Sequence, residues 1–214
     1  MVQPPVYTEE NEKALERIIA FSDAVFGFAI TLLVLGLLEI PRPELDASIL
    51  MAFAGHWQDI LSFLVGFLTI FVCWLNHHHM FAHIVRYNTT LMWINGFLLL
   101  IITFTPLPTA VLAEFLDKEN NVGVIFFGFT YFLIATFYFL IWSYAYKNRL
   151  VRDDGDQRYF YCIRLTYMVA SLYTLLTFFV CFVSTPVAIA MYTLMFMVFA
   201  FPQAFARRLQ TLIA

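Results

Sequence analysis

The segment Arg17–Glu39 constrains the fold of this chain more than any other. Between residues 24 and 38 it carries no charged side chain, and its apolar character reaches back to residue 18. A helix of about 20 mostly apolar residues is long enough to cross a bilayer. An aspartate, Asp23, nevertheless lies inside the segment, where an ionised side chain costs at least about 2.5–3.5 kcal/mol at the bilayer centre and less near the ends. We therefore expect a membrane-spanning helix in which Asp23 faces other protein and finds polar partners there.

A helical projection of this segment, at about 100° per residue, separates two neighbouring stripes of side chains. The bulky stripe contains Phe21, Phe28, Leu32, Leu35 and Glu39. The small-residue stripe contains Ala20, Ala24, Gly27 and Thr31. Small residues let membrane helices approach closely, so the second stripe is expected to be a packing surface. Taken alone, the bulky stripe is more typical of a face against lipid or core. Ser22 and Asp23 are expected to point away from it.

The composition places the whole chain in the membrane class. Of 214 residues, 62% are hydrophobic and only 13% are charged, and the mean hydropathy is +0.79. The net charge of −3 and the absence of a basic patch argue against nucleic-acid binding. The three cysteines lie in or beside apolar segments, so no disulfide framework is indicated. Residues 1–16 are polar and acidic, unlike a signal peptide, so we expect the first helix to be retained.

Breaks between the apolar runs predict an all-α protein with six transmembrane helices in one domain covering residues 1–214. Polar loops rich in proline or charge separate most of the runs, and a Ser-Thr-Pro sequence at 184–186 is the expected turn between the last two. The predicted spans are about 18–38, 57–78, 90–112, 122–144, 160–183 and 186–206.

The distribution of positive charge predicts the orientation of these helices. Of the 12 lysines and arginines, all but Arg42 and Lys118 fall on the side of the N-terminus. Cytoplasmic loops carry the excess of lysine and arginine, so both termini are expected in the cytoplasm. The first helix then enters where the second one ends. Asp23 and Ser22 should therefore lie at the same depth as Asn76 and His77. Asn95, near the start of the third helix, should lie at that depth too.

The histidines at 77–79 and His83 raise the question of a metal site. His79 and His83 are one helical turn apart, as in helical zinc pairs. No cysteine or carboxylate lies near them in sequence, and consecutive histidines point to different faces, which favours interfacial or hydrogen-bonding roles. We expect no metal and no cofactor. No nucleophile–base spacing or phosphate-binding loop is present, so an enzyme has little support.

The motif Arg17-x-x-x-Phe21-Ser22-Asp23 allows a family comparison. It is followed by the run Ala29-Ile30-Thr31-Leu32-Leu33-Val34-Leu35. The later patterns are Trp74-Leu75-Asn76-His77-His78 and Pro106-Leu107-Pro108-Thr109. Together they resemble the transmembrane protein 175 family of endosomal/lysosomal potassium channels, specifically its single-repeat prokaryotic members.

The resemblance implies a homotetramer in which the first helix lines the pore, with no Thr-Val-Gly-Tyr-Gly filter loop, a loop that this sequence lacks. Position by position, the family's hydrophobic constriction falls on Phe28, Leu32 and Leu35, with Thr31 beside it. The family usually has isoleucine or leucine where this chain has Phe28, a difference that bears on the pore's width. The implied structural network consists of Arg17, Phe21, Ser22, Asp23, Trp74, Asn76 and His77.

The sequence hypothesis is therefore a multi-pass, potassium-permeable cation channel of a prokaryotic cell membrane, gated by dewetting at stacked apolar rings. Glu39 is either a carboxylate at the pore mouth or an ordinary solvated loop residue. The alternative is a non-conducting membrane assembly or a proton-linked carrier that uses Asp23 and His77. Carriers usually show internal repeats or broken helices, and neither is visible in the sequence.

Overall fold

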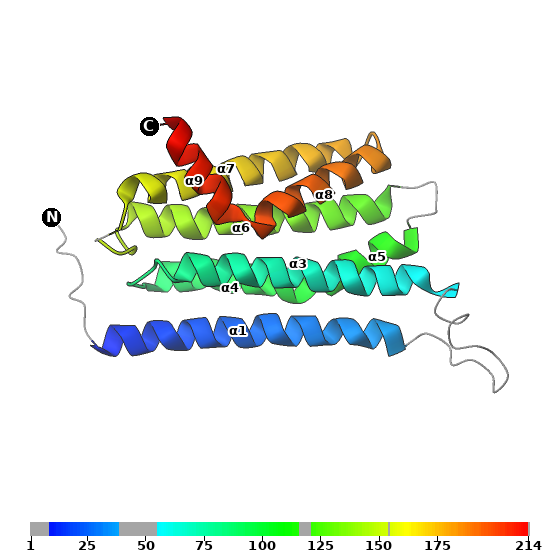
Figure 1. Cartoon of the computed structure of the whole chain (residues 1–214). Helices are drawn as coiled ribbons and strands as arrows, with labels where there is room; N and C mark the ends of the chain where they lie inside the picture. The colour runs from blue at the N-terminus through cyan, green and yellow to red at the C-terminus, as the bar shows by residue number, and fades with distance from the viewer. Residues whose placement is uncertain (1–8, 39–54, 116–120, 154, 214) are drawn as a thin grey trace.

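The computed structural model is a bundle of helices that run roughly side by side along one axis (Figure 1). It describes residues 9–38, 55–115, 121–153 and 155–213. Five helical stretches in these ranges are long and apolar enough to cross a membrane, and Thr185–Met197 is a shorter apolar helix. The predicted all-α membrane class is confirmed. The helices are α1 Glu9–Leu38, α3 Trp57–Phe81, α4 Thr89–Phe104, α5 Pro106–Phe115, α6 Val122–Lys147, α7 Gln157–Val180, α8 Thr185–Ala200 and α9 Pro202–Ile213.

The helix bounds depart from the predicted spans at three places, each with a local cause. The first helix begins at Glu9 rather than near residue 18. The glutamates between these two positions are good helix formers, and negative charge stabilises a helix N-terminus. The span expected at 90–112 is divided between α4 and α5 at Pro106, and the span expected at 186–206 is divided at Pro202. Proline has no backbone N–H and interrupts the hydrogen-bond ladder of a helix.

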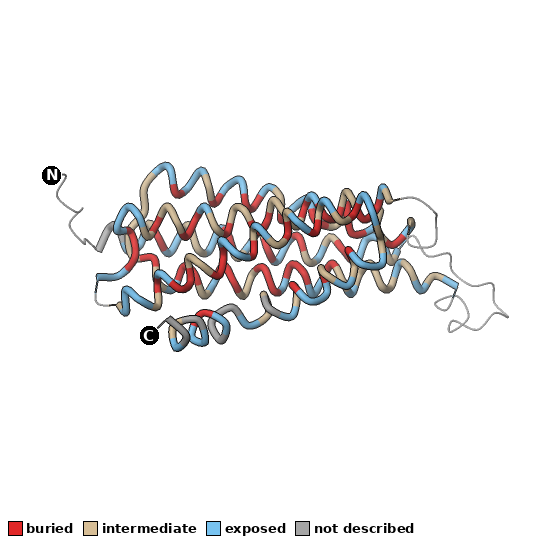
Figure 2. The backbone as a smooth tube through the Cα atoms, turned by 90° about the horizontal axis from the view of Figure 1, so that it is seen from above, coloured by how far each residue is buried: buried red, intermediate tan, exposed pale blue. Residues whose placement is uncertain are grey.

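Helix α1 lies on one side of the bundle, with α6 and α7 on the other (Figure 1). Within the described chain α1 packs chiefly on α3 and α4, while α6 packs on α4, α5 and α7. Buried residues recur along the helices between exposed ones, as expected when each helix turns one face inward (Figure 2). The position of α1 leaves one of its faces without a neighbouring helix from the part of the chain that the structure describes.

The core between α3, α6 and α7 is built from large aromatic side chains whose polar atoms all have partners. Trp142 is fully buried and donates from Nε1 to the backbone carbonyl of Phe160 at 3.0 Å. The hydroxyl of the fully buried Tyr138 donates to the carbonyl of Cys73. Such bonds remove the cost of burying aromatic polar groups. The core therefore fixes α3, against which α1 packs.

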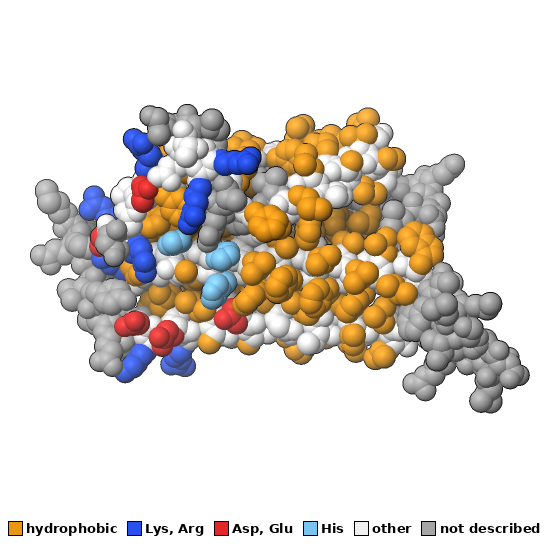
Figure 3. All heavy atoms as spheres, viewed as in Figure 1, with side chains coloured by type: hydrophobic (Ala, Val, Ile, Leu, Met, Phe, Trp, Pro, Cys, Tyr) orange, Lys and Arg blue, Asp and Glu red, His pale blue; other side chains and the backbone are white. Residues whose placement is uncertain are grey.

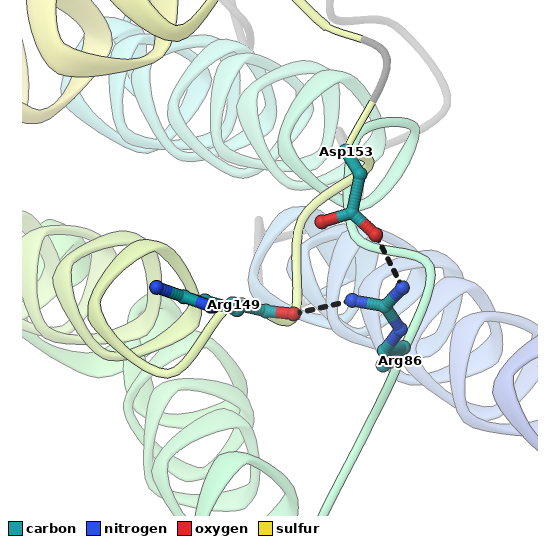
Figure 4. Close-up of polar contacts among 3 residues, drawn as sticks. All are labelled: Arg86, Arg149 and Asp153. Carbon is teal, nitrogen blue, oxygen red and sulfur yellow. Dashed lines mark hydrogen bonds and ion pairs between the residues drawn. The ribbon is translucent and has the colours of Figure 1, made fainter. Parts of the chain in front are cut away.

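Two loops meet at one end of the bundle and are joined by Arg86 (Figure 4). Its guanidinium donates to the carbonyl oxygen of Arg149 at 2.9 Å and to the carboxylate of Asp153 at 2.5 Å. An isolated β-bridge between Ile84 and Val151 links the same loops. The hydrogen bond from Arg86 lowers the pKa of the Asp153 carboxyl below its ordinary value. The lysines and arginines visible in Figure 3 gather at this end, and on the face shown hydrophobic side chains are spread along the rest of the bundle.

Candidate functional site on the first helix

Helix α1 has one buried face and one exposed face. The buried face contains Leu15, Ser22, Phe26, Ala29 and Leu33. The exposed face contains Phe21, Ala24, Gly27, Phe28, Thr31 and Leu35. Phe28 is 61% exposed and Leu35 is 53% exposed, whereas Leu32 lies nearer the boundary and is half-buried. The exposed face is long, apolar and uncharged between residues 24 and 38, which is unusual for a surface unless lipid or another chain covers it.

The described residues of both predicted stripes lie on this exposed face, with Leu32 at its boundary. The small-residue stripe, expected to be a packing surface, is not covered by another helix of the described chain. A Cβ atom added to Gly27 or Gly36 would meet no described atom within 4 Å. Within the described residues, this stripe is therefore open to lipid or to a second molecule.

The buried face of α1 carries a chain of hydrogen bonds to α3 and α4. The Ser22 hydroxyl donates to the carbonyl of Ile18 at 2.9 Å and accepts from the Asn95 side-chain amide at 3.0 Å. The amide oxygen of Asn95 lies 3.0 Å from Nε2 of His77. All three polar side chains are buried. Their bonds hold α1 at one rotation about its axis relative to its two neighbours, which is a positioning role.

The geometry also fixes the tautomer of His77. The Asn95 oxygen only accepts, so the proton in this hydrogen bond must be on Nε2 of His77. Nδ1 of the same ring has no hydrogen-bond partner among the described residues. Phe26 and Phe81 hold the ring, with centroids at 5.3 Å and 4.2 Å from that of His77.

Asp23 has a partner on α3, but outside this chain of hydrogen bonds. Nε1 of Trp74 donates to the Asp23 carboxylate at 2.9 Å. Asp23 is half-buried, at the edge between the two faces of α1. Asp23 thus has its partner on α3, as its depth predicted. That partner is the indole of Trp74 rather than Asn76 or His77.

Asn76 is buried but turns away from α1. Its amide nitrogen donates to the carbonyls of Val72 and Phe199, both at 2.8 Å, and its oxygen accepts from the hydroxyl of Tyr167 at 3.4 Å. Neighbouring residues on a helix point about 100° apart, so the side chains of Asn76 and His77 lie on different sides of α3. The expected network is thus two separate groups of contacts, one toward α1 and one toward α7 and α8.

Arg17 and Phe21 lie apart from both groups. They are exposed and line a cavity of about 410 Å³ between α1 and α4, together with Tyr87. Arg17 forms no ion pair with a described residue. The ion pairs observed elsewhere in the described ranges join His56 with Asp59 and Arg86 with Asp153. Glu39 lies outside the described residues.

Sequence reasoning assigned no role to three residues that complete these contacts. Asn95 was expected at the right depth, and its polarity inside an apolar helix was the available signal. Phe26 lies one turn after Ser22 on the same face, so the helical period could have indicated it. Tyr167 gave no signal, because its partnership with Asn76 crosses 91 positions of sequence. Within the described ranges, no three histidine, cysteine or acidic side chains are grouped to hold a metal ion.

Comparisons with known proteins agree with this architecture. The sequence model of the family described as endosomal/lysosomal potassium channel TMEM175 matches residues 17–106, which include the motif and the bonded residues of α1, α3 and α4. A protein of Streptomyces collinus named a potassium channel is 31% identical over 190 residues, covering 87% of this chain and 92% of that protein. A protein of Chamaesiphon minutus, also named a potassium channel, is 34% identical over 161 residues, covering 73% and 76%.

The crystal structure of a lysosomal potassium-selective channel TMEM175 homolog from Chamaesiphon minutus superimposes with a TM-score of 0.76. It is 29% identical, and the match covers 89% of this chain and 98% of the other. Sequence and fold agree over nearly the whole length, and so the chain belongs to the TMEM175 family.

Proposed function

We propose that this protein is a potassium-permeable cation channel of a prokaryotic cell membrane, assembled as a homotetramer around α1. The observation that carries the proposal is the uncovered face of α1, with Phe28 and Leu35 more than half exposed. The names of the two relatives and of the solved homolog support potassium as the permeant ion. Four copies arranged about an axis would cover four such faces at once, which is how a closed cyclic assembly buries a surface.

In this arrangement Phe28, Leu32 and Leu35 form stacked apolar rings with Thr31 beside them. Apolar rings of this kind gate by excluding water, so an ion crosses only when the constriction widens enough to hydrate. The small residues beside the rings let four helices approach the axis closely. Leu32 is half-buried and contributes less than the other two to the width of the pathway. Glu39, one turn beyond Leu35, would place four carboxylates at the outer mouth.

The polar contacts on the other face of α1 position the rings. A rotation of α1 by one residue, about 100°, would replace Phe28 at the axis with a neighbouring side chain. Ser22, Asn95 and His77 oppose that rotation because their hydrogen bonds cannot be made elsewhere in an apolar environment. Asp23 adds a second tie through Trp74. These residues are positioning residues, and we assign none of them contact with the ion.

Potassium flux from liposomes that contain the purified protein tests this function. With a potassium gradient and no proton gradient, the channel releases potassium until the membrane potential balances it, and protein-free liposomes treated with valinomycin give the reference release of a potassium-permeable membrane. A non-conducting assembly gives no flux above empty liposomes. A proton-linked carrier gives potassium flux that stops when proton movement is blocked. Either of these two results would overturn the proposal.

A further inference from the structure

Helix α9 crosses the end of the bundle instead of running along it (Figure 1). At 12 residues it is too short to span a bilayer, which requires about 20. It begins at Pro202 and packs against α7, where Ala206 is buried and Gln210 donates to the carboxylate of Asp156 at 2.6 Å. These contacts hold α9 across the start of α7, at the end of the bundle where the basic side chains gather (Figure 3).

The exposed side chains described in α9 and just before it are mostly aromatic or basic. Phe201 and Phe205, one turn apart, are 69% and 37% exposed. Arg207 and Arg208 are also exposed. Arg208 lies three residues after Phe205 and so on the aromatic face, whereas Arg207 points to a different side. Long arginine side chains can extend from apolar surface to the lipid headgroups, and aromatic residues combined with arginines are typical of a helix that lies in the membrane interface.

An apolar groove begins directly beside Phe205. It has a volume of about 170 Å³ and lies between α7 and α8, lined by Val169, Ala170, Leu194 and Met195 among others. The polar side chains that border it are already bonded within the chain: Thr166 to the Cys162 carbonyl, and Tyr173 to the Met191 carbonyl. The groove therefore offers a ligand apolar surface only, which suits a hydrocarbon chain.

The arginines of α9 have no carboxylate partner among the described residues. Arg207 contacts the hydroxyl of Tyr159, which lies two turns before Thr166 on the groove side of α7. The nearby acids have other partners, since Asp153 accepts from Arg86 and Asp156 accepts from Gln210 and from two backbone N–H groups. Among the described residues, neither Arg207 nor Arg208 is therefore paired with a carboxylate.

We propose that α9 and the groove between α7 and α8 form a binding site for an anionic phospholipid. The headgroup phosphate lies against Arg207 and Arg208, and part of one acyl chain lies in the groove beside Phe205. Charge complementarity selects the headgroup, and the apolar groove requires that the anion be attached to a hydrocarbon chain. A free phosphate has the charge but no hydrocarbon chain. A zwitterionic lipid has the chain but complements the charge of the arginines only in part.

Native mass spectrometry of the purified protein, titrated with phosphatidylglycerol or phosphatidylcholine, tests the site without any measurement of flux. We expect tighter binding of phosphatidylglycerol. An arginine near the membrane surface contributes about a fivefold factor in affinity, so the R207Q/R208Q variant should bind phosphatidylglycerol about 25-fold more weakly. The matched control is K147Q/R149Q, which removes two exposed charges at the same end of the bundle but outside α9 and should leave the affinity unchanged.

Two further measurements separate a lipid site from a site for any anion. Replacing the groove residue Val169 with tryptophan should weaken phosphatidylglycerol binding while both arginines remain, and thermal unfolding verifies that the variant is folded. Glycerol phosphate, which has the headgroup charge without the acyl chains, should not displace the lipid. Displacement by glycerol phosphate, equal binding of the two lipids, or unchanged affinity in R207Q/R208Q would each overturn the proposal.

Discussion

The two faces of α1 differ in what they need from the rest of the molecule. On the buried face, Ser22 has its hydrogen bonds completed by Asn95 and through it by His77, all within one chain. On the exposed face, Phe28 and Leu35 remain more than half exposed. The hydrogen bonds of the buried face therefore form when the chain folds. The exposed apolar face depends on lipid or other subunits for its contacts. Mutations on the two faces should consequently affect different properties, stability on one and permeation on the other.

The largest effect is expected for His77→Ala. The change leaves the Asn95 oxygen without its donor and opens a cavity between Phe26 and Phe81, which together should cost about 2–4 kcal/mol of unfolding free energy. Reversible unfolding in mixed detergent micelles measures it. His78→Ala is the matched control, because His78 is exposed and its loss should cost less than about 0.5 kcal/mol. Equal stabilities of the two variants would remove the structural role of the buried face.

The exposed face should respond through conduction. Phe28→Ala removes the bulkiest ring of the proposed constriction and should raise basal potassium flux about tenfold, the change that follows from lowering the barrier by about 1.4 kcal/mol. Leu35→Ala should raise the flux less, because four leucine side chains are less bulky than four phenylalanines and constrict the pathway less. Flux assays on the two purified variants, matched for tetramer content, decide between them. A larger increase from Leu35→Ala would move the gate outward and leave Phe28 as a packing residue.

A smaller effect is expected where the two faces meet, at Asp23. Asp23→Asn keeps an oxygen that can accept from Trp74, so it should cost less than about 1.5 kcal/mol of stability. Trp74→Phe removes the donor and leaves the carboxylate half-buried without it, so it should cost more. Neither variant should change the preference for potassium over sodium in reversal-potential measurements. A variant with normal thermal stability and altered ion preference would place Asp23 in the permeation pathway.

The sequence determined the membrane class and the phase of α1 because both depend on local periodicity. A run of apolar residues indicates a span, and the 3.6-residue period distinguishes the face of Ser22 from that of Phe28. The partners across helices were harder to predict. Depth alone could bring Asp23 near α3, but the choice of Trp74 over Asn76 depends on the rotation of α3. Arg17 and Phe21 belong to the sequence motif but not to the bonded network, because sequence proximity does not place them on the same face.

Glu39→Gln would test whether the exposed face continues to the outer mouth. A ring of four carboxylates raises the local cation concentration, so its removal should lower inward current by less than about threefold at low salt. The difference should disappear as the ionic strength rises, since the Debye length falls to about 8 Å at physiological strength. Single-channel recordings at two potassium concentrations measure it. Identical currents for both proteins at low salt would show that Glu39 does not lie at the pore mouth.

The smallest effect should come from Asp153→Asn, a change in a polar contact exposed to water. The Asp153 side chain is 70% exposed, although that of Arg86 is only 15% exposed, and ion pairs open to water are worth about 0–1 kcal/mol. Because the pKa of Asp153 is lowered in the folded protein, its contribution is complete above the ordinary value of 3.8 and is lost as the pH falls below that value. Unfolding measured at pH 7 should therefore show a loss below about 1 kcal/mol that diminishes further in high salt. A loss as large as that of His77→Ala would mean that burial is not what separates the two kinds of contact, and the contrast between the two faces of α1 would need another cause.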